Sequence, residues 1–600
     1  MKLYKISLAL LMGIGMLTSC SEKLDVTDPN RPTTDGFGST AAELEESVIA
    51  MYNHIRMEGS FARVGYGNEI CRGDEIWNCS QVWYQPIDDF NFPVEFPGAE
   101  NNLPMWVWRE WYYTINVCNF VLSKCGEDDS ALNDQMKKIK GQALFIRGLS
   151  YYTLSGYFQN PILVTDYSSY ASLDGLYAPN EEEGDEDVYA QYDRVLDQVE
   201  KDFSEAMALL PSRDEGGEWA KGRATCGAAA GYYARTLMQR HKYNEALTVL
   251  KAIIGGTYGH YELMADYGDN FQEGKYENNA ESLFEVQFLD YGSQGTEDEW
   301  TPVNTNKNAT QGHAIETNLA PGDVNGWCDL AAAPWLYELF KKERTTSGSL
   351  DPRLYWTIGT YEPEWEGYAY GNVCFTNVMT SDISTQFITN NNYGGLPVAK
   401  HTNLRTNLYS SVIQGLHCGV NLRMMRYSDV LLRAAECENE ISGPTQQAID
   451  WINQVRRRAQ LKDLQLSDFG SKDKLFEQIA NVERPKEFGC EFGRCFDLIR
   501  WGFFYSPDRM KQLKEHGTFR RSNDKTKMKE PVSYANIGSD AELKCSFDTY
   551  RAGHEYLPIV TYITNVNPNV KGNSANLDID NSAYFSKKGW TVHPVVDLSK

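Results

Sequence analysis

The chain has 600 residues, a hydrophobic fraction of 42% and a formal net charge of −25. This length exceeds one ordinary hydrophobic core, so it predicts several packed regions or one extended helical array. The negative charge repels phosphate backbones and argues against a nucleic-acid partner.

The first twenty residues have the layout of a secretory signal. Lys2 and Lys5 form a basic start, residues 6–16 are almost wholly apolar, and Leu17-Thr18-Ser19-Cys20 ends the segment. The apolar run is too short for a permanent membrane helix. The cysteine is similar to that of a bacterial lipobox, so we expect residues 1–19 to be a lipoprotein signal peptide and Cys20 to be lipidated. An ordinary signal peptide with an incidental cysteine is the alternative.

Helical patterns follow a short tether. Residues 20–37 are polar and rich in Asp, Pro and Thr, which predicts an extended segment. Thr40 and Glu43 have the spacing of a capping box, and the apolar residues after them recur at helical intervals. Similar stripes predict helices over residues 136–146, 188–210 and 444–459.

Residues 228–254 show the alternation of small and large residues that is typical of a tetratricopeptide helix hairpin. Small side chains at Ala234 and Ala246 would let the two helices approach closely, while larger residues fill the gap to the next pair. Residues 421–459 indicate a second pair with a less regular period. An ordinary antiparallel helix hairpin is the alternative for both. Stacked pairs of this kind present a concave or flat face to partners.

Three segments between the helices, residues 58–103, 255–326 and 347–421, are far longer than ordinary connections. They are rich in Gly, Asn, Asp and aromatic residues, and binding residues tend to lie on such loops of a rigid scaffold. The sequence therefore predicts a mainly α fold: a tetratricopeptide-like α-α superhelical scaffold with long irregular loop insertions.

Cysteine spacing and motif content argue against a metal or cofactor. The chain has 13 Cys, whose spacings fit no disulfide framework, so we expect buried free thiols. It has no CxxC, HExxH or Cys/His cluster for zinc, and no GxSxG elbow, Walker loop or complete Rossmann glycine set. With 82 acidic residues some carboxylate pair at glycosidase spacing is inevitable, so its presence carries no weight. Catalysis is thus the weaker class, and no cofactor is expected.

The most specific motif is Glu483-Arg484-x-x-Glu487-x-x-x-Glu491-x-x-Arg494-x-x-Asp497-Leu498-x-Arg500-Trp501-Gly502. Supporting motifs are Gly222-Arg223-Ala224-Thr225, Asp351-Pro352-Arg353, residues 143–152, Tyr556-Leu557-Pro558-Ile559 and Asn567-Pro568-Asn569. On these motifs and the lipobox, the chain resembles the SusD/RagB family of outer-membrane nutrient-binding lipoproteins over nearly its whole length. Pro485 departs from the family pattern and predicts that a helix starts near it.

The charges of the main motif have two interpretations. Alternating Glu and Arg could serve acid/base chemistry, but the spacings Glu487/Glu491, Glu491/Arg494 and Arg494/Asp497 are typical of a salt-bridged helix. Exposed ion pairs contribute little to stability, so a network that matters must be partly buried. We expect a structural network that locks this helix to the repeat array.

The resemblance implies an N-terminal SusD-like helical region over residues 38–255 and a C-terminal SusD/RagB region over residues 256–600. It implies a non-catalytic lipoprotein, anchored on the outer face of the outer membrane, that binds an oligosaccharide and delivers it to a SusC-like TonB-dependent transporter. A RagB-like peptide-binding lid and a secreted glycoside hydrolase are the alternatives. A glycan binder should show flat exposed rings flanked by amide and carboxylate groups, and a peptide binder a groove with free backbone groups.

In glycan-binding relatives the ring platforms lie in the long loop after the first helix, so the resemblance makes Trp83 and Tyr84 the first-choice ligand contacts. The other candidates are Trp77 with its neighbours Arg72, Asp74 and Asn78, and, for opposing walls, Trp300, Tyr361 and Trp365. Burial of a ring under its own loop is the alternative for each. Trp83 and Tyr84 cannot both be buried easily if the backbone is extended, because successive side chains then point to opposite faces.

Overall fold

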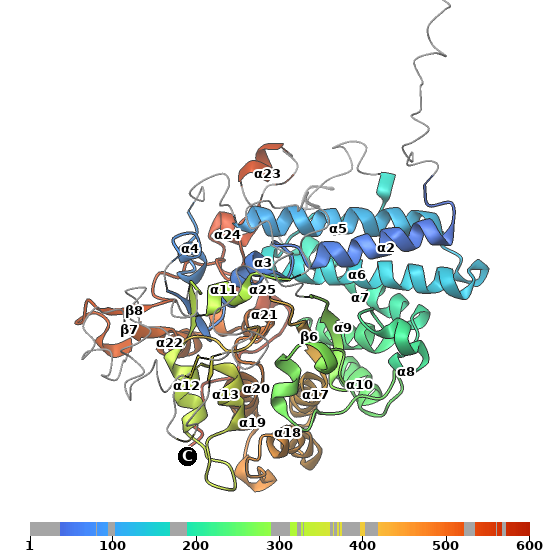
Figure 1. Ribbon diagram of the computed structural model, residues 1–600. Helices are drawn as coiled ribbons and strands as arrows, with labels where there is room; N and C mark the ends of the chain where they lie inside the picture. The colour runs from blue at the N-terminus through green and yellow to red at the C-terminus, as the bar shows by residue number, and fades with distance from the viewer. Residues whose placement is uncertain are drawn as a thin grey trace, which may run out of the picture.

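The structure is a computed structural model, shown in Figure 1. It describes residues 37–79, 81–93, 103–168, 189–289, 312–320, 326–327, 329–359, 364, 369–370, 373–374, 396–402, 418–520, 534–559, 561–566, 570 and 572–599. The predicted signal peptide, the tether and Cys20 lie outside these residues. None of the described helices is long and apolar enough to span a membrane.

The described part of the chain is mainly helical, which confirms the predicted fold class. The longer helices are α2 (Ala41–Ile55), α3 (Arg63–Ile70), α5 (Leu103–Cys125), α6 (Asp134–Phe158), α7 (Ala190–Leu209), α9 (Cys226–Gln239), α10 (Tyr243–Ile254), α12 (Pro334–Lys341), α17 (Tyr427–Ser442), α18 (Gln446–Arg458) and α22 (Pro507–His516). The shorter helices are α4 (Gln85–Asp88), α8 (Arg213–Gly216), α11 (Ile315–Leu319), α13 (Pro352–Thr357), α19 (Lys472–Gln478), α20 (Arg484–Phe488), α21 (Arg494–Arg500), α23 (Thr561–Val566), α24 (Ser574–Leu577) and α25 (Ser582–Lys587).

The strands form two-stranded antiparallel pairs. The pairs are β1 (Ile76–Asn78) with β3 (Leu330–Ala332), β2 (Ser282–Val286) with β6 (Leu422–Arg426), β4 (Ala369–Tyr370) with β5 (Val373–Cys374), and β7 (Thr518–Arg520) with β8 (Leu543–Cys545). The pairs β1–β3 and β2–β6 therefore join segments that are far apart in the sequence, while β4–β5 is a local hairpin.

The helices pack in an array that follows the chain. Helix α5 packs on α6, α6 on α7, α7 on α9, α9 on α10, α10 on α17 and α17 on α18. In Figure 1, α2, α5 and α6 run side by side at the top of the array. The capping box predicted at Thr40 and Glu43 is present at the start of α2.

Both predicted hairpins are present, with one correction. Helices α9 and α10 form the first, and Ala234 and Ala246 are fully buried, as the close contact requires. The second consists of α17 and α18, but its first residues form strand β6 and not a helix. The sequence Leu422-Arg423-Met424-Met425-Arg426 pairs with β2, and this tertiary pairing overrides the helical pattern.

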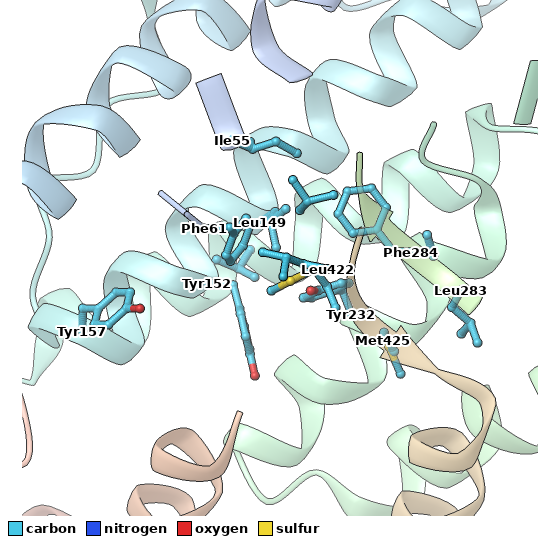
Figure 2. Close-up of a cluster of buried hydrophobic side chains, with 14 of the residues drawn as sticks. Ile55, Phe61, Leu149, Tyr152, Tyr157, Tyr232, Leu283, Phe284, Leu422 and Met425 are labelled. Carbon is cyan, nitrogen blue, oxygen red and sulfur yellow. The ribbon is translucent and has the colours of Figure 1, made fainter. Parts of the chain in front are cut away.

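The core of the array lies where α6 and α9 meet the β2–β6 pair (Figure 2). The rings of Tyr152 and Tyr232 pack edge to face with centres 5.8 Å apart, beside Phe284 and Met425. Gly231 of α9 lets this helix pack closely against β6, because a Cβ at Gly231 would lie 2.5 Å from the sulfur of Met425. Ten cysteines are buried and free, which confirms the prediction for these ten: Cys71, Cys79, Cys118, Cys125, Cys226, Cys418, Cys437, Cys490, Cys495 and Cys545.

The motif from Glu483 to Gly502 is not one salt-bridged helix. It runs from the last residue of a π-helical turn (Ile479–Glu483) through α20, a turn and α21, with Pro485 in the first turn of α20 as predicted. The expected opposite-charge pairs Glu491/Arg494 and Arg494/Asp497 are not formed, because Glu491 binds Arg426 and Arg494 binds Asp74. One other local pair is present, between Asp497 and Arg500 of α21. The prediction of one continuous salt-bridged helix is therefore wrong, while the prediction of a buried network is confirmed.

Arg426 is the centre of the first part of this network. Its guanidinium is 1% exposed and lies 2.6 Å from Glu281, 2.9 Å from Glu487 and 2.9 Å from Glu491. Arg353 and Arg458 also bind Glu487. Burial opposes ionisation of Glu487, but these three guanidinium groups outweigh it and hold its pKa below the usual range.

A second part of the network joins the motif to the hairpins. Asp429 at the start of α17 lies 2.8 Å from Arg235 of α9 and 2.8 Å from Arg484. Arg484 also binds Asp497 at 2.6 Å, and Arg500 binds the same carboxylate at 2.7 Å. The motif is thus locked to both helix hairpins by buried, multiply paired charges, as the sequence predicted.

Replacing Ala246 by Trp tests the close contact between α9 and α10. We expect Ala246→Trp to lower the free energy of unfolding by about 1–3 kcal/mol, because the hairpin cannot close around the added ring. Urea denaturation measures the change. Thr248→Trp on the exposed face of the same helix is the control; equal stability of both variants and the wild type would contradict the packing.

Replacing Glu487 by Gln tests the buried network. We expect a loss of roughly 3–5 kcal/mol in the free energy of unfolding, because three arginines lose a buried partner charge. Since the pKa of Glu487 is lowered, its contribution is complete above its ordinary value and is lost as the pH falls through the lowered one.

The matched control is Glu218→Gln, which removes one carboxylate from an exposed pair with Lys221. This variant should unfold at the same urea concentration as the wild type. Equal losses in the free energy of unfolding for the two variants would show that the buried network stabilises the fold no more than an exposed ion pair does.

Candidate functional site

The first predicted loop is a well-packed part of the scaffold. Residues 58–103 contain α3, β1 and α4, so the expectation of an irregular segment is wrong for the described residues. Strand β1 pairs with β3 from Ile76↔Ala332 to Asn78↔Leu330. The pairing continues past the strands, because Cys79 donates its backbone N–H to Asp329 and Asp329 donates to Asn318 of α11.

A short turn after β1 carries the candidate ligand-binding residues Gln81 and Trp83. The side chain of Asn78 accepts from the backbone N–H of Gln81 at 3.0 Å and donates to its carbonyl at 2.8 Å, which fixes the turn. Gln81 in turn donates its amide N–H to the carboxylate of Asp329 at 2.8 Å. Val82 is 71% exposed, and Trp83 is half-buried against the main core.

A second ring comes from the segment before β3. Trp327 is half-buried and donates its backbone N–H to Thr317 of α11 at 2.7 Å. The guanidinium of Arg63 lies 5.6 Å from the centre of its ring. The Gln81–Asp329 hydrogen bond joins the segment that carries Trp83 to the segment that carries Trp327. We call Gln81, Val82, Trp83 and Trp327, which all keep some exposed surface, the Trp83 face. Asp329 is 2% exposed and positions Gln81 from beneath this face.

Tyr84 is not part of this face, which corrects the prediction. It is 2% exposed, its hydroxyl donates to the carbonyl of Arg63 at 3.3 Å, and burial raises its pKa. Gly67 leaves room for the ring, because a Cβ there would lie 2.3 Å from the Tyr84 hydroxyl. The backbone at Tyr84 is helical and not extended, yet only one of the two adjacent rings is fully buried.

The second-choice candidates have structural contacts in place of ligand contacts. Trp77 is 2% exposed and stacks on Phe519 with ring centres 4.0 Å apart. Asp74 is 1% exposed and accepts two hydrogen bonds from Arg494, at 2.7 and 2.9 Å. Burial opposes ionisation of Asp74, but Arg494 outweighs it and holds the pKa below the usual range.

Arg72 and Asn78 are likewise buried. Arg72 donates to the backbone carbonyls of Gly156 and Glu555, and Asn78 holds the turn described above. Side chains with so little exposed surface offer no face to a ligand, so the assignments of Arg72, Asp74, Trp77 and Asn78 are corrected. Trp300, Tyr361 and Trp365 lie outside the described residues.

Two members of the Trp83 face, Gln81 and Trp327, were not predicted from the sequence, and neither was Asp329, which positions Gln81. Trp327 and Asp329 lie just beyond the second long segment, and nothing in their spacing points to the first loop. Gln81 precedes Trp83 by two residues, which was the available signal. No group of metal-ligating side chains occurs among the described residues.

A pocket of about 330 Å³ lies elsewhere, between the region of α8, the start of α9 and β2. Its charged groups already have partners. Arg213 donates to the carbonyls of Asn279 and Ala280, Arg223 pairs with Glu45, and Glu285 binds Asn421. The Trp83 face, with half-buried rings beside the amide of Gln81, is therefore the better candidate for a ligand with both apolar faces and hydroxyl groups.

Comparison with known proteins finds related families over both halves of the chain. Residues 280–575 match the family model described as the SusD family, and residues 24–238 match the one described as starch-binding and associating with outer membrane. A SusD-like protein of Formosa agariphila is 23% identical over 505 residues, which cover 81% of this chain and 87% of that protein. A SusD-like protein of Bacteroides ovatus is 22% identical over 516 residues, 82% of each chain.

Solved structures share the fold. A SusD superfamily protein from Bacteroides vulgatus matches with a TM-score of 0.66 and 22% identity, and the match covers 90% of this chain and 100% of that one. The surface glycan-binding protein A from Bacteroides thetaiotaomicron, in complex with laminarihexaose, matches with a TM-score of 0.61 and 20% identity over 89% and 99% of the two chains. Because models of this family match both halves of the sequence and the fold is shared along its length, the chain belongs to the SusD/RagB family.

Proposed function

We propose that the protein binds an oligosaccharide at the Trp83 face and passes it on without cleaving it. A sugar ring has one face of C–H groups and a rim of hydroxyls, so it stacks on an aromatic ring while amides and carboxylates bind the rim. The half-buried ring of Trp83 next to the hydrogen-bonded Gln81–Asp329 pair is the observation that carries this proposal.

The comparisons support the same chemistry. One matched family is described as starch-binding, and one structural relative is a glycan-binding protein in complex with laminarihexaose. Neither fixes the sugar for this chain. A peptide ligand would need free backbone groups, but the N–H groups of Cys79, Trp327 and Asp329 already donate to Asp329 or to α11, which favours a glycan.

The setting of this activity follows from the N-terminus and the family. We propose that Cys20 carries the lipid, that the protein stands on the outer face of the outer membrane, and that it delivers its ligand to a SusC-like TonB-dependent transporter. The family description of association with the outer membrane supports this location. Two or more acyl chains on one cysteine give stable anchoring.

Calorimetry on Trp83→Ala tests the ligand site. Once a glycan array has identified a ligand, loss of the stacked ring should weaken binding by roughly 1–3 kcal/mol, by analogy with bases stacked on aromatic rings. Chromatography of the ligand after long incubation should recover it intact.

The matched control is Trp219→Ala, which removes another half-buried Trp, beside Lys138 and Arg223. It should leave affinity unchanged. Equal affinity of Trp83→Ala and wild type would move the site elsewhere, and cleaved ligand would favour a hydrolase.

Labelling with palmitate tests the anchor. Label should enter the wild type in a Gram-negative host and not enter Cys20→Ala, because acylation requires the thiol. The Ser19→Ala variant keeps the cysteine and should still be labelled. Equal labelling of the wild type and Cys20→Ala would leave an ordinary signal peptide as the interpretation.

A further inference from the structure

The chain ends in a segment that crosses both helix hairpins. Residues 588–599, which we call the C-terminal strap, follow α25 and contain no helix or strand. Lys588 lies 2.7 Å from Asp193 of α7. Trp590 stacks on His241, in the turn between α9 and α10, with ring centres 4.1 Å apart and planes at 6°. The strap is therefore held against the first hairpin before it reaches the second.

At the second hairpin the strap is held by His593. Its Nε2 lies 2.7 Å from Glu440 at the end of α17, and its Nδ1 lies 2.7 Å from Asp473 in α19. Ionised carboxylates only accept hydrogen bonds, so both ring nitrogens must donate and the ring must carry a proton on each. The ring also stacks on Phe476 with centres 3.9 Å apart. This geometry specifies an imidazolium.

Other charges around His593 come from three elements. Lys472 of α19 lies 2.6 Å from the second oxygen of Glu440. Arg509 of α22 donates to the strap carbonyls of His593 and Pro594, both at 2.8 Å, and its own charge is paired with Glu477 at 2.6 Å. Burial lowers the pKa of His241 to about 4, so this neighbouring ring is neutral. The carboxylates of Glu440 and Asp473 therefore dominate at His593.

We propose that the C-terminal strap is a proton-dependent clasp, closed by the His593 imidazolium between Glu440 and Asp473 and released when that proton is lost. A neutral imidazole can donate to one carboxylate only and turns a lone pair toward the other. The strap would then remain attached through Lys588, Trp590 and Arg509, with a weakened hold at His593. Because the strap contacts both hairpins, the clasp makes the attachment between the α9–α10 and α17–α18 hairpins depend on the pH around the protein.

The pKa directions define the window in which the clasp is closed. Burial opposes protonation of His593, but hydrogen bonds and charges from Glu440 and Asp473 outweigh it and raise the pKa above its ordinary value of 6.5. Burial likewise opposes ionisation of Glu440, but His593 outweighs it and lowers that pKa. The stabilisation from His593 is therefore complete below pH 6.5 and is lost as the pH rises through its raised pKa. The stabilisation from Glu440 is lost at the other end of the range, as the pH falls through its lowered pKa.

Amide hydrogen exchange of the full chain between about pH 6 and pH 9, corrected for intrinsic exchange rates, tests the clasp. In the wild type the opening of residues 588–599 should increase by up to about tenfold per pH unit above the ordinary histidine pKa, until the ring is neutral. In His593→Gln the strap should already be open at the lowest pH and show no further pH dependence.

His260→Gln is the matched control, since His260 is exposed and lies 3.8 Å from Glu262; it should keep the wild-type profile. The His593 resonance of the wild type gives a readout that needs no variant, and should titrate above 6.5. Strap opening that is equal at both ends of the pH range in the wild type, or a His593 midpoint at or below the ordinary value, would overturn the proposal.

Discussion

The buried contact between Arg426 and Glu487 is the constraint on which the rest of the structure depends. It joins the end of strand β6 to helix α20, and through Glu281 and Glu491 it brings in the segment before β2 and the turn before α21. Charges without partners would be very costly at this depth, so each chain segment must reach its place before the network is satisfied. The network therefore favours one arrangement of segments that are far apart in the sequence.

The same network reaches the base of the candidate site. Asp74 and Glu75 directly precede β1; Asp74 binds Arg494, and Glu75 accepts the backbone N–H of Cys490 at 3.1 Å. Burial raises the pKa of Glu75 to about 8, so this carboxyl serves as a neutral group beside the ionised Asp74. Strand β1, which precedes the turn with Gln81 and Trp83, is thus held in place by the buried contacts of Asp74 and Glu75. A rigid support of this kind suits a surface that binds its ligand without changing shape.

The sequence was most informative where the pattern is local, and least informative where the partner is remote. Helix α2 with its capping box and the α9–α10 hairpin follow from residues a few positions apart, so the periodicity predicts them. The charges of Glu487 and Arg494 were correctly expected to be structural, but their partners Arg426 and Asp74 could not be predicted, because no local spacing encodes contacts made through the tertiary fold. For the same reason the sequence offers Trp83 as a candidate and gives no signal for Trp327. Burial of Tyr84 and Trp77 depends on Gly67 and Phe519, which only the fold places beside them.

The central claim is that a rigid, charge-locked scaffold presents the Trp83 face to an intact oligosaccharide. A crystal structure of the full soluble chain with a glycan identified by array screening tests it most directly. The account predicts uncleaved sugar density with one ring stacked over Trp83, hydroxyls within hydrogen-bond distance of Gln81, and no change in the Arg426–Glu487 contact. Sugar bound away from this face, or a cleaved ligand, would contradict it.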